Sequence, residues 1–97
     1  MSDVQPIARL VRISGRVQGV GYRAWTEREA RTRGLSGWVR NRQDGTVEAL
    51  FVGGELAVAA MIEACRKGPR FAEVAALTVD NAAQAVNLSG FQQRPTE

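Results

Sequence analysis

Histidine is absent from this sequence of 97 residues, and cysteine occurs only once, at Cys65. Without histidine, the chain cannot form a Ser-His-Asp or Cys-His nucleophilic site, and it lacks the usual proton carrier near neutral pH. A single cysteine forms no internal disulfide and cannot supply the ligands of a zinc site. We therefore expect a cytoplasmic protein without a zinc centre.

Long apolar runs are absent as well, since no stretch approaches the roughly 20 apolar residues of a membrane span. The N-terminus has no basic segment followed by an apolar one, so we expect no secretory signal and no membrane partner. The length and the 44% content of hydrophobic residues suit one domain with a modest core. We expect this domain to span residues 7–91, to be monomeric, and to have flexible termini at residues 1–6 and 92–97.

Positive charge is concentrated in the first part of the chain. Residues 1–42 hold nine arginines and three acidic residues, a net charge of +6, whereas residues 43–97 hold four basic and seven acidic residues, a net charge of −3. Twelve of the thirteen basic residues are arginine. This distribution favours an anionic ligand, and it is compatible with nucleic acid as an alternative partner.

Three glycines, Gly15, Gly19 and Gly21, lie between an apolar run and a segment of helical character. Glycine allows positive φ and a close approach of the backbone to a ligand, and successive N–H groups in such a turn can form a nest for an oxyanion. The N-terminus of the following helix, with Arg23 in its first turn, would add further donors. The pattern favours an anion-binding loop, although a tight strand-to-helix connection with an exposed arginine explains the same residues.

The order of the expected strands and helices indicates the fold. Apolar alternation predicts strands at residues 7–14, 36–42, 46–52 and 72–80, and apolar residues at helical spacing predict helices at residues 22–33 and 55–67. Residues 86–91 could add a short fifth edge strand. We therefore predict an α+β fold of the ferredoxin-like type. It is a split β-α-β sandwich (βαββαβ) with a four-stranded antiparallel sheet and two helices on one face.

Asn41 lies at the end of the second expected strand, directly before a hairpin turn. Because side chains alternate along a strand, Asn41 shares a face with Val39 and lies opposite Trp38 and Arg40. If Val39 faces the helices, the carboxamide of Asn41 does too, and there it could hold a water molecule. An asparagine that caps its own turn is the simpler explanation, and the sequence does not show that Asn41 lies near the glycine loop.

Two motifs resemble those of a known family. The runs ISGRVQGVGYR at residues 13–23 and GWVRNRQDGTV at residues 37–47, followed by Gly53, are similar to the two signatures of the acylphosphatase family. Together with the expected fold, the resemblance covers about residues 7–91. It implies hydrolysis of a small-molecule acyl phosphate to a carboxylate and inorganic phosphate.

The resemblance also implies roles for individual residues. Arg23 would bind the phosphoryl group, and Asn41 would hold the attacking water in line. The backbone N–H groups that would surround the phosphate are those of Arg16, Val17, Gln18, Gly19, Val20, Gly21 and Tyr22. No metal, cofactor or covalent intermediate is implied, and no nucleic acid partner is expected.

Two features depart from the family pattern. Tyr22 stands where the family usually has phenylalanine or methionine, and it suits the same space if its hydroxyl reaches water. Phe91 is followed by Gln92, Gln93 and Arg94 rather than by alternating apolar and aromatic residues. The last edge strand is therefore less well supported than the site.

Two other functions remain open from the sequence. RNA-binding modules share the same order of elements, but they stack bases on aromatic residues of the central strands. The expected outer face instead presents Leu10, Arg12, Leu50 and Val52. The second alternative is a non-catalytic domain of this fold that handles an acyl or carbamoyl phosphate within a larger chain.

Overall fold

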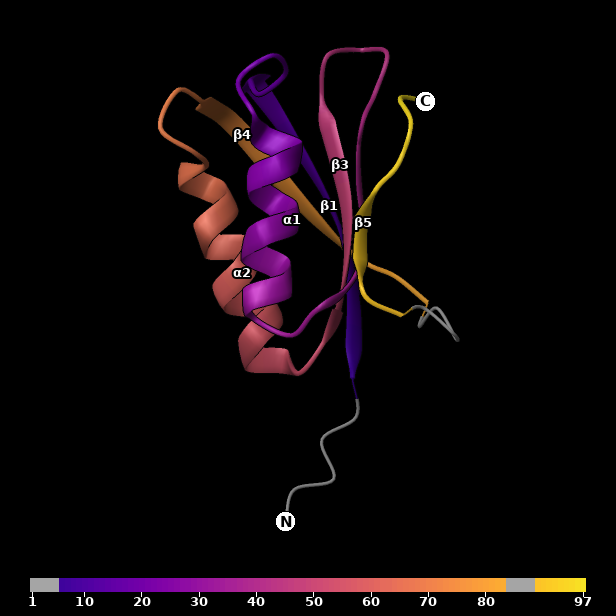
Figure 1. The fold of residues 1–97 in the computed structure, drawn as a ribbon. Helices are drawn as coiled ribbons and strands as arrows, with labels where there is room; N and C mark the ends of the chain where they lie inside the picture. The colour runs from indigo at the N-terminus through magenta and orange to yellow at the C-terminus, as the bar shows by residue number, and fades with distance from the viewer. Residues whose placement is uncertain (1–5, 84–88) are drawn as a thin grey trace.

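Five strands form a single sheet, and two helices cover one of its faces (Figure 1). The structure is a computed structural model that describes residues 6–83 and 89–97. In chain order the elements are β1 (Ile7–Arg16), α1 (Tyr22–Thr32), β2 (Ser36–Asn41), β3 (Val47–Gly53), α2 (Glu55–Lys67), β4 (Glu73–Asn81) and β5 (Phe91–Gln93). This order confirms the predicted α+β fold of the ferredoxin-like type.

The strand order in the sheet is β4-β1-β3-β2-β5. β1 pairs antiparallel with β3 and β4, and β2 pairs antiparallel with β3, so the four-stranded antiparallel sheet is confirmed. β5 adds a fifth strand that runs parallel to β2 at the outer edge. It begins at Phe91, where the expected edge strand ended, and residues 86–88 of that expectation lie outside the described part of the chain.

β1 is longer than the sequence predicts, because it continues to Arg16. Gly15 and Arg16 pair with Val74 and Glu73 of β4, after a bulge between Ser14 and Gly15. Gly15 has a φ of 116°, and a Cβ at this position would lie 2.2 Å from the carbonyl oxygen of Glu73. Only glycine fits there. Gly15 therefore allows the backbones of β1 and β4 to lie close together, and it is not part of the loop. The loop itself is residues 17–21.

The hydrophobic core lies between the sheet and the two helices. The helix-facing side chains of the central strands alternate as the sequence predicts; they are Val11, Ile13, Val39, Val47, Ala49 and Phe51. The helices contribute Tyr22, Thr26 and Ala30 from α1, and Val58, Met61, Ile62 and Cys65 from α2. Over residues 6–83 and 89–97, neither helix has the length and apolar character to cross a bilayer.

The C-terminal residues, where we expected a flexible terminus at residues 92–97, run along β2. β5 extends to Gln93, and the N–H of Arg94 then donates to the carbonyl oxygen of Val39 at 2.8 Å. The N–H of Glu97 donates to the carbonyl oxygen of Asn41 at 3.1 Å. Backbone pairing needs no apolar side chains, which is why the polar composition of this segment did not indicate that it pairs with β2.

Replacing Phe91 by alanine tests whether this side chain anchors β5. The Phe91 side chain is 1% exposed and stacks on Phe51, with 5.6 Å between the ring centroids. Because removal of a buried phenylalanine costs about 3–5 kcal/mol, Phe91→Ala should lower the free energy of unfolding by about that amount in urea denaturation. Leu56 is 86% exposed, so the control variant Leu56→Ala should change it by less than about 0.5 kcal/mol. Equal losses in the two variants would contradict the anchoring role.

Candidate active site

The pairing register of β3 brings two separate parts of the chain to one edge of the sheet. Val47 of β3 pairs with Ile13 of β1 on one side and with Asn41 of β2 on the other. Since β1 and β2 are both antiparallel to β3, they run in the same direction. Neighbouring strands lie about 4.8 Å apart, so Ile13, near the end of β1, is about 10 Å from Asn41, the last residue of β2. The loop that follows β1 therefore lies beside Asn41, which the sequence alone did not show.

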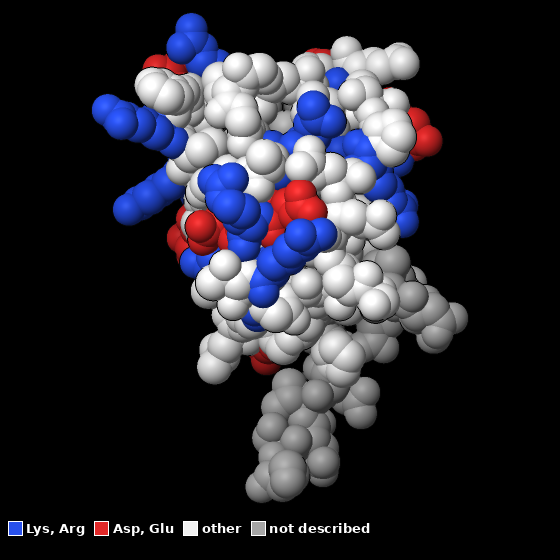
Figure 2. Space-filling view, in the orientation of Figure 1, with Lys and Arg blue, Asp and Glu red and all other residues white. Residues whose placement is uncertain are grey.

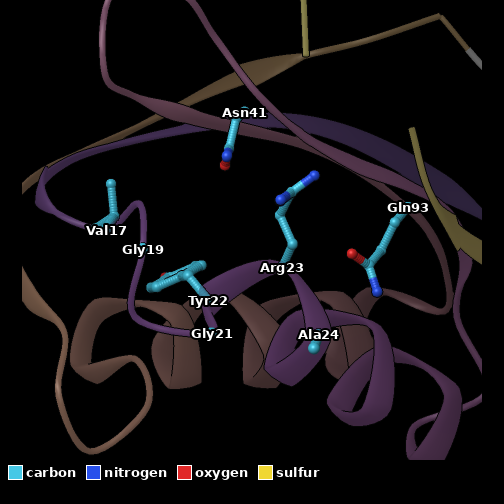
Figure 3. A pocket seen from close by; sticks show the side chains of 8 residues that line it. All are labelled: Val17, Gly19, Gly21, Tyr22, Arg23, Ala24, Asn41 and Gln93. Atoms are coloured by element: carbon cyan, nitrogen blue, oxygen red, sulfur yellow. The ribbon is translucent and has the colours of Figure 1, made fainter. Parts of the chain in front are cut away.

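A pocket of about 160 Å³ lies between the loop and Asn41. Its lining consists of Val17, Gly19, Gly21, Tyr22, Arg23, Ala24, Asn41 and Gln93. Figure 3 shows that Arg23 comes from the start of α1 and Asn41 from the opposite side, and that both side chains point into the space between them. Among the residues that the structure describes, no cluster of three or more Cys, Asp or Glu side chains forms a candidate metal site.

The backbone N–H groups around the loop are the second feature of the pocket. Within residues 6–83 and 89–97, no hydrogen bond is donated by the N–H groups from Gln18 to Ala24. Gly19 and Gly21 have φ angles of 77° and 80°, the conformation in which successive N–H groups form a concave nest. The first hydrogen bond of α1 runs from the N–H of Trp25 to the carbonyl oxygen of Gly21 at 3.0 Å. The unpaired N–H groups of the first turn of α1 thus follow directly after the unpaired N–H groups of the loop.

The structure gathers most, but not all, of the predicted site residues at this pocket. Those that line it are Val17, Gly19, Gly21, Tyr22, Arg23 and Asn41, whereas Arg16, Gln18 and Val20 do not. Arg16 belongs to β1 and is exposed, and Val20 packs against the core. The side chain of Gln18 donates to the carbonyl oxygens of Arg42 and Thr46 in the β2–β3 turn.

Gln93 lines the pocket, although we expected it to lie in a flexible terminus. Its Nε2 donates to Oε1 of Glu27 in α1 at 2.8 Å, and Arg31 pairs with the other carboxylate oxygen of Glu27 at 2.6 Å. Because a carboxylate only accepts, the amide nitrogen faces Glu27 and leaves the amide oxygen on the side of Arg23 (Figure 3). Residues two apart in a strand share a face, so the buried Phe91 was the signal that could have predicted an inward Gln93.

The hydroxyl of Tyr22 does not reach water, contrary to our expectation. It donates to the carbonyl oxygen of Cys65 at 2.6 Å inside the protein, and burial is the main cause that raises the pKa of Tyr22 above its usual value. The helical partner of that carbonyl would be the N–H of Pro69, which proline lacks. Tyr22 therefore completes the hydrogen bonding at the end of α2, and it joins the start of α1 to that end.

The strand that carries Asn41 is held from the opposite face of the sheet. The neighbours Arg40 and Arg42 both reach Oε1 of Glu48 in β3, at 2.8 and 3.5 Å, and Arg12 reaches Oε2 at 3.3 Å. The Glu48 side chain is 7% exposed. Burial acts to raise the pKa of Glu48, but the hydrogen bonds from Arg40 and Arg12 outweigh it and hold the pKa below its usual value. The carboxylate is therefore charged at neutral pH and ties the end of β2 to β3.

Lys and Arg side chains are spread over the end of the molecule that holds the pocket. Figure 2 shows their atoms over the upper part of the helix-covered face, with Asp and Glu atoms between them. The loop after β1 and the start of α1 lie at this end (Figure 1). Residues 1–42, which supply the loop and α1, hold nine arginines and three acidic residues, and a net positive charge of this kind attracts small anions.

The fold and the pocket define a ferredoxin-like α+β domain suited to a small anion. A family model described as Acylphosphatase matches residues 9–93. The protein named Acylphosphatase from Rhodospirillum rubrum is 60% identical over 87 residues, which are 90% of this chain and 94% of that protein. The crystal structure of acylphosphatase from Bacillus subtilis has a TM-score of 0.87 at 36% identity and covers 91% of this chain and 98% of that chain. The chain belongs to the acylphosphatase family.

The same fold also occurs within a larger protein. The crystal structure of full-length HypF in the phosphate- and nucleotide-bound form matches with a TM-score of 0.88 at 25% identity. The match covers 98% of this chain but 13% of that chain. Similarity of fold therefore extends to proteins of very different size, and the function has to be argued from the site.

The variant Tyr22→Phe tests the direction of the Tyr22 hydroxyl. It leaves the buried carbonyl of Cys65 without its donor, so we expect a loss of about 1–3 kcal/mol in the free energy of unfolding, measured in urea. Because the hydroxyl lies away from the pocket, the affinity for inorganic phosphate, measured by calorimetry, should stay within about twofold of wild type. Unchanged stability together with weakened phosphate binding would show that the hydroxyl faces the pocket.

Acid titration of stability tests the buried carboxylate of Glu48. Its pKa in the folded state is depressed, so below the unfolded value of about 4.3 the unfolded chain binds more protons and stability falls with falling pH. Glu48→Gln removes this titration. We expect the variant to be less stable than wild type at pH 7 but to lose less further stability between about pH 5 and pH 3. Urea denaturation at several pH values measures this, and parallel pH curves would contradict it.

Proposed function

We propose that this chain hydrolyses acyl phosphates, with a carboxylate and inorganic phosphate as products. The observation that supports this most directly is the meeting of unpaired loop amides, the guanidinium of Arg23 and the carboxamide of Asn41 at one pocket. Membership of the acylphosphatase family agrees with it. The roles of the individual residues follow from what each group can donate or accept.

The phosphoryl group binds on the loop side of the pocket in this proposal. The donors are the backbone N–H groups of Val17, Gln18, Gly19, Val20, Gly21 and Tyr22, together with the two parallel N–H groups that Arg23 offers to two oxygens. A hydrogen bond to a charged group contributes about 1.5–3 kcal/mol, so several such bonds hold a dianion against competing water. Arg16 is the weakest member of the predicted set, because it belongs to β1.

Asn41 holds the attacking water. Its carboxamide both donates and accepts, so it can orient the water oxygen toward phosphorus from the side of the pocket opposite to α1. The bond from water oxygen to phosphorus forms as the bond from phosphorus to the carboxylate oxygen breaks, and a phosphate oxygen of the substrate takes the water proton. Because a carboxylate leaves readily, positioning and electrostatic stabilisation suffice without histidine, metal, cofactor or covalent intermediate.

The RNA-binding alternative has less support on the outer face of the sheet. Trp38 lies on that face, and the guanidinium groups of Arg40 and Arg94 lie 4.7 and 5.0 Å from its ring centroid. A base that stacks on Trp38 would compete with both arginines. Leu50, on the same face, is 7% exposed and offers little surface.

We further propose that the protein acts as a monomer in the cytoplasm. The groups to which this proposal gives roles, namely the loop amides, Arg23 and Asn41, meet within a single chain, so the proposed chemistry requires no residue from a second copy. The thiol of Cys65 is buried and free, and burial raises its pKa to about 12. A thiol in this state is unreactive and is compatible with a reducing compartment.

Substitution of Arg23 and Asn41 tests the proposed roles. The wild-type protein should hydrolyse benzoyl phosphate in the presence of EDTA, and Arg23→Ala and Asn41→Ala should each lose on the order of 10²-fold or more in kcat/KM. Because Arg23 binds the phosphoryl group, Arg23→Ala should also weaken competitive inhibition by inorganic phosphate. Asn41→Ala should leave this inhibition nearly unchanged, since Asn41 acts on the water.

The matched controls are Arg28→Ala and Asn81→Ala, which remove the same chemical groups elsewhere. Arg28 is exposed on α1 outside the pocket, and Asn81 ends β4 next to Arg9, at the other end of β1. Both variants should keep wild-type rates. Hydrolysis that survives Asn41→Ala would remove Asn41 from its role, and phosphate binding by a wild-type protein without hydrolysis would favour the non-catalytic alternative.

A further inference from the structure

The side chain of Gln18 connects the loop to the turn that follows Asn41. Its Nε2 donates to the carbonyl oxygen of Arg42 at 2.8 Å and to that of Thr46 at 2.9 Å. Both partners are carbonyl oxygens, which only accept, so the orientation of the amide is determined and both of its N–H groups are used. The residue belongs to the family motif, but the motif assigns a role to its backbone N–H and none to its side chain.

The two carbonyl groups belong to the closing hydrogen bonds of the β2–β3 turn. The N–H of Arg42 donates to the carbonyl oxygen of Thr46 at 2.8 Å, and the N–H of Gly45 donates to that of Arg42 at 3.1 Å. Gln18 therefore attaches to the hydrogen-bonded base of the turn, and one of its acceptors, Arg42, directly follows Asn41. A displacement of the turn relative to the loop would have to break both side-chain bonds.

Apart from the bond that the carbonyl oxygen of Gly21 accepts from Trp25 at the start of α1, residues 17–21 have no other hydrogen bond to a different element within the described ranges. The remaining anchors of the loop are apolar, namely Val17, which is buried in the core, and Val20, which packs against it. Apolar contacts resist separation, but they permit sliding, because they have no direction. Hydrogen bonds are directional, so the amide of Gln18 determines where the loop lies along the edge of the sheet.

We propose that the side chain of Gln18 is a positioning residue that sets the distance between the loop amides and Asn41. This inference rests on the proposed function, in which the loop binds the phosphoryl group and Asn41 holds the water. Productive attack requires reacting atoms about 3–3.5 Å apart and in line, and a misplacement of 1 Å can cost about 10²-fold in rate. Gln18 therefore acts on the rate of the chemical step through Asn41, without touching the reacting atoms.

The variants Gln18→Met and Gln18→Glu test this role. Methionine keeps the length of the side chain without donors, and glutamate keeps its shape but directs a carboxylate at two carbonyl oxygens. We expect kcat for benzoyl phosphate to fall roughly 10- to 100-fold in both variants, with the larger loss in Gln18→Glu. The inhibition constant of inorganic phosphate should change less than about threefold, because the loop amides and Arg23 remain.

A double-mutant cycle with Asn41→Ala distinguishes positioning from a general loss of structure. If Gln18 acts through Asn41, Gln18→Met should change kcat less than about threefold in the Asn41→Ala background. Gln92→Met is the matched control, because Gln92 is an exposed glutamine of β5 outside the pocket, and it should keep wild-type kinetics. Circular dichroism and urea denaturation verify that each variant is folded.

Three results would overturn the inference. The effects of Gln18→Met and Asn41→Ala could multiply in the double variant, Gln18→Met could weaken phosphate binding as much as it lowers kcat, or Gln18→Met could leave kcat unchanged. In each case an active wild-type protein would leave the proposed function intact. A folded wild-type protein that does not hydrolyse benzoyl phosphate would instead overturn both proposals together.

Discussion

The register of β3 with its two neighbours is the constraint on which the candidate site depends. Val47 is paired with Ile13 on one side and Asn41 on the other, so Ile13 near the end of β1 and Asn41 at the end of β2 lie level with each other across the sheet. The loop amides that precede α1 follow directly after β1. The carboxamide of Asn41 is at the end of β2. A shift of one residue in the pairing of β2 with β3 would turn Asn41 to the opposite face of the sheet, away from Arg23.

Several interactions of different kinds hold Asn41 and the end of β2 in this position. On the outer face, Glu48 binds the arginines on both sides of Asn41. At the edge of the sheet, the N–H of Glu97 donates to the carbonyl oxygen of Asn41. On the side of the loop, the side chain of Gln18 donates to the carbonyl oxygen of Arg42 in the β2–β3 turn. A site without histidine has to rely on groups that are already in position before the substrate arrives, because reorganisation during the reaction would add to the barrier. The ion pairs and hydrogen bonds around Asn41 meet this requirement of the proposed mechanism.

Much of the fold could be predicted, because local patterns determine it. The boundaries of α2 agree with the apolar stripe that ends at Cys65 and with the Gly68-Pro69 pair after it, and alternation identified the helix-facing residues of β1 and β3. The predictions that were wrong concern interactions between distant residues. The hydroxyl of Tyr22 binds Cys65, and Gly15 accommodates Glu73; no pattern within either segment reveals such a partner, because the partner lies elsewhere in the chain.

The sequence by itself determined the helices and strands and their order. It also indicated the functional groups: backbone amides in a glycine-rich turn, an arginine at the start of a helix and an asparagine at the end of a strand. These follow from the conformational freedom of glycine and from the period of apolar residues, which are properties of short segments. The tertiary structure decided that Arg23 and Asn41 face one pocket and that Gln93 also lines it. It also decided that Gln18 connects the loop to the β2–β3 turn. Those facts depend on strand register and on the packing of helices against the sheet, which the whole chain settles together because each contact requires groups from separate elements.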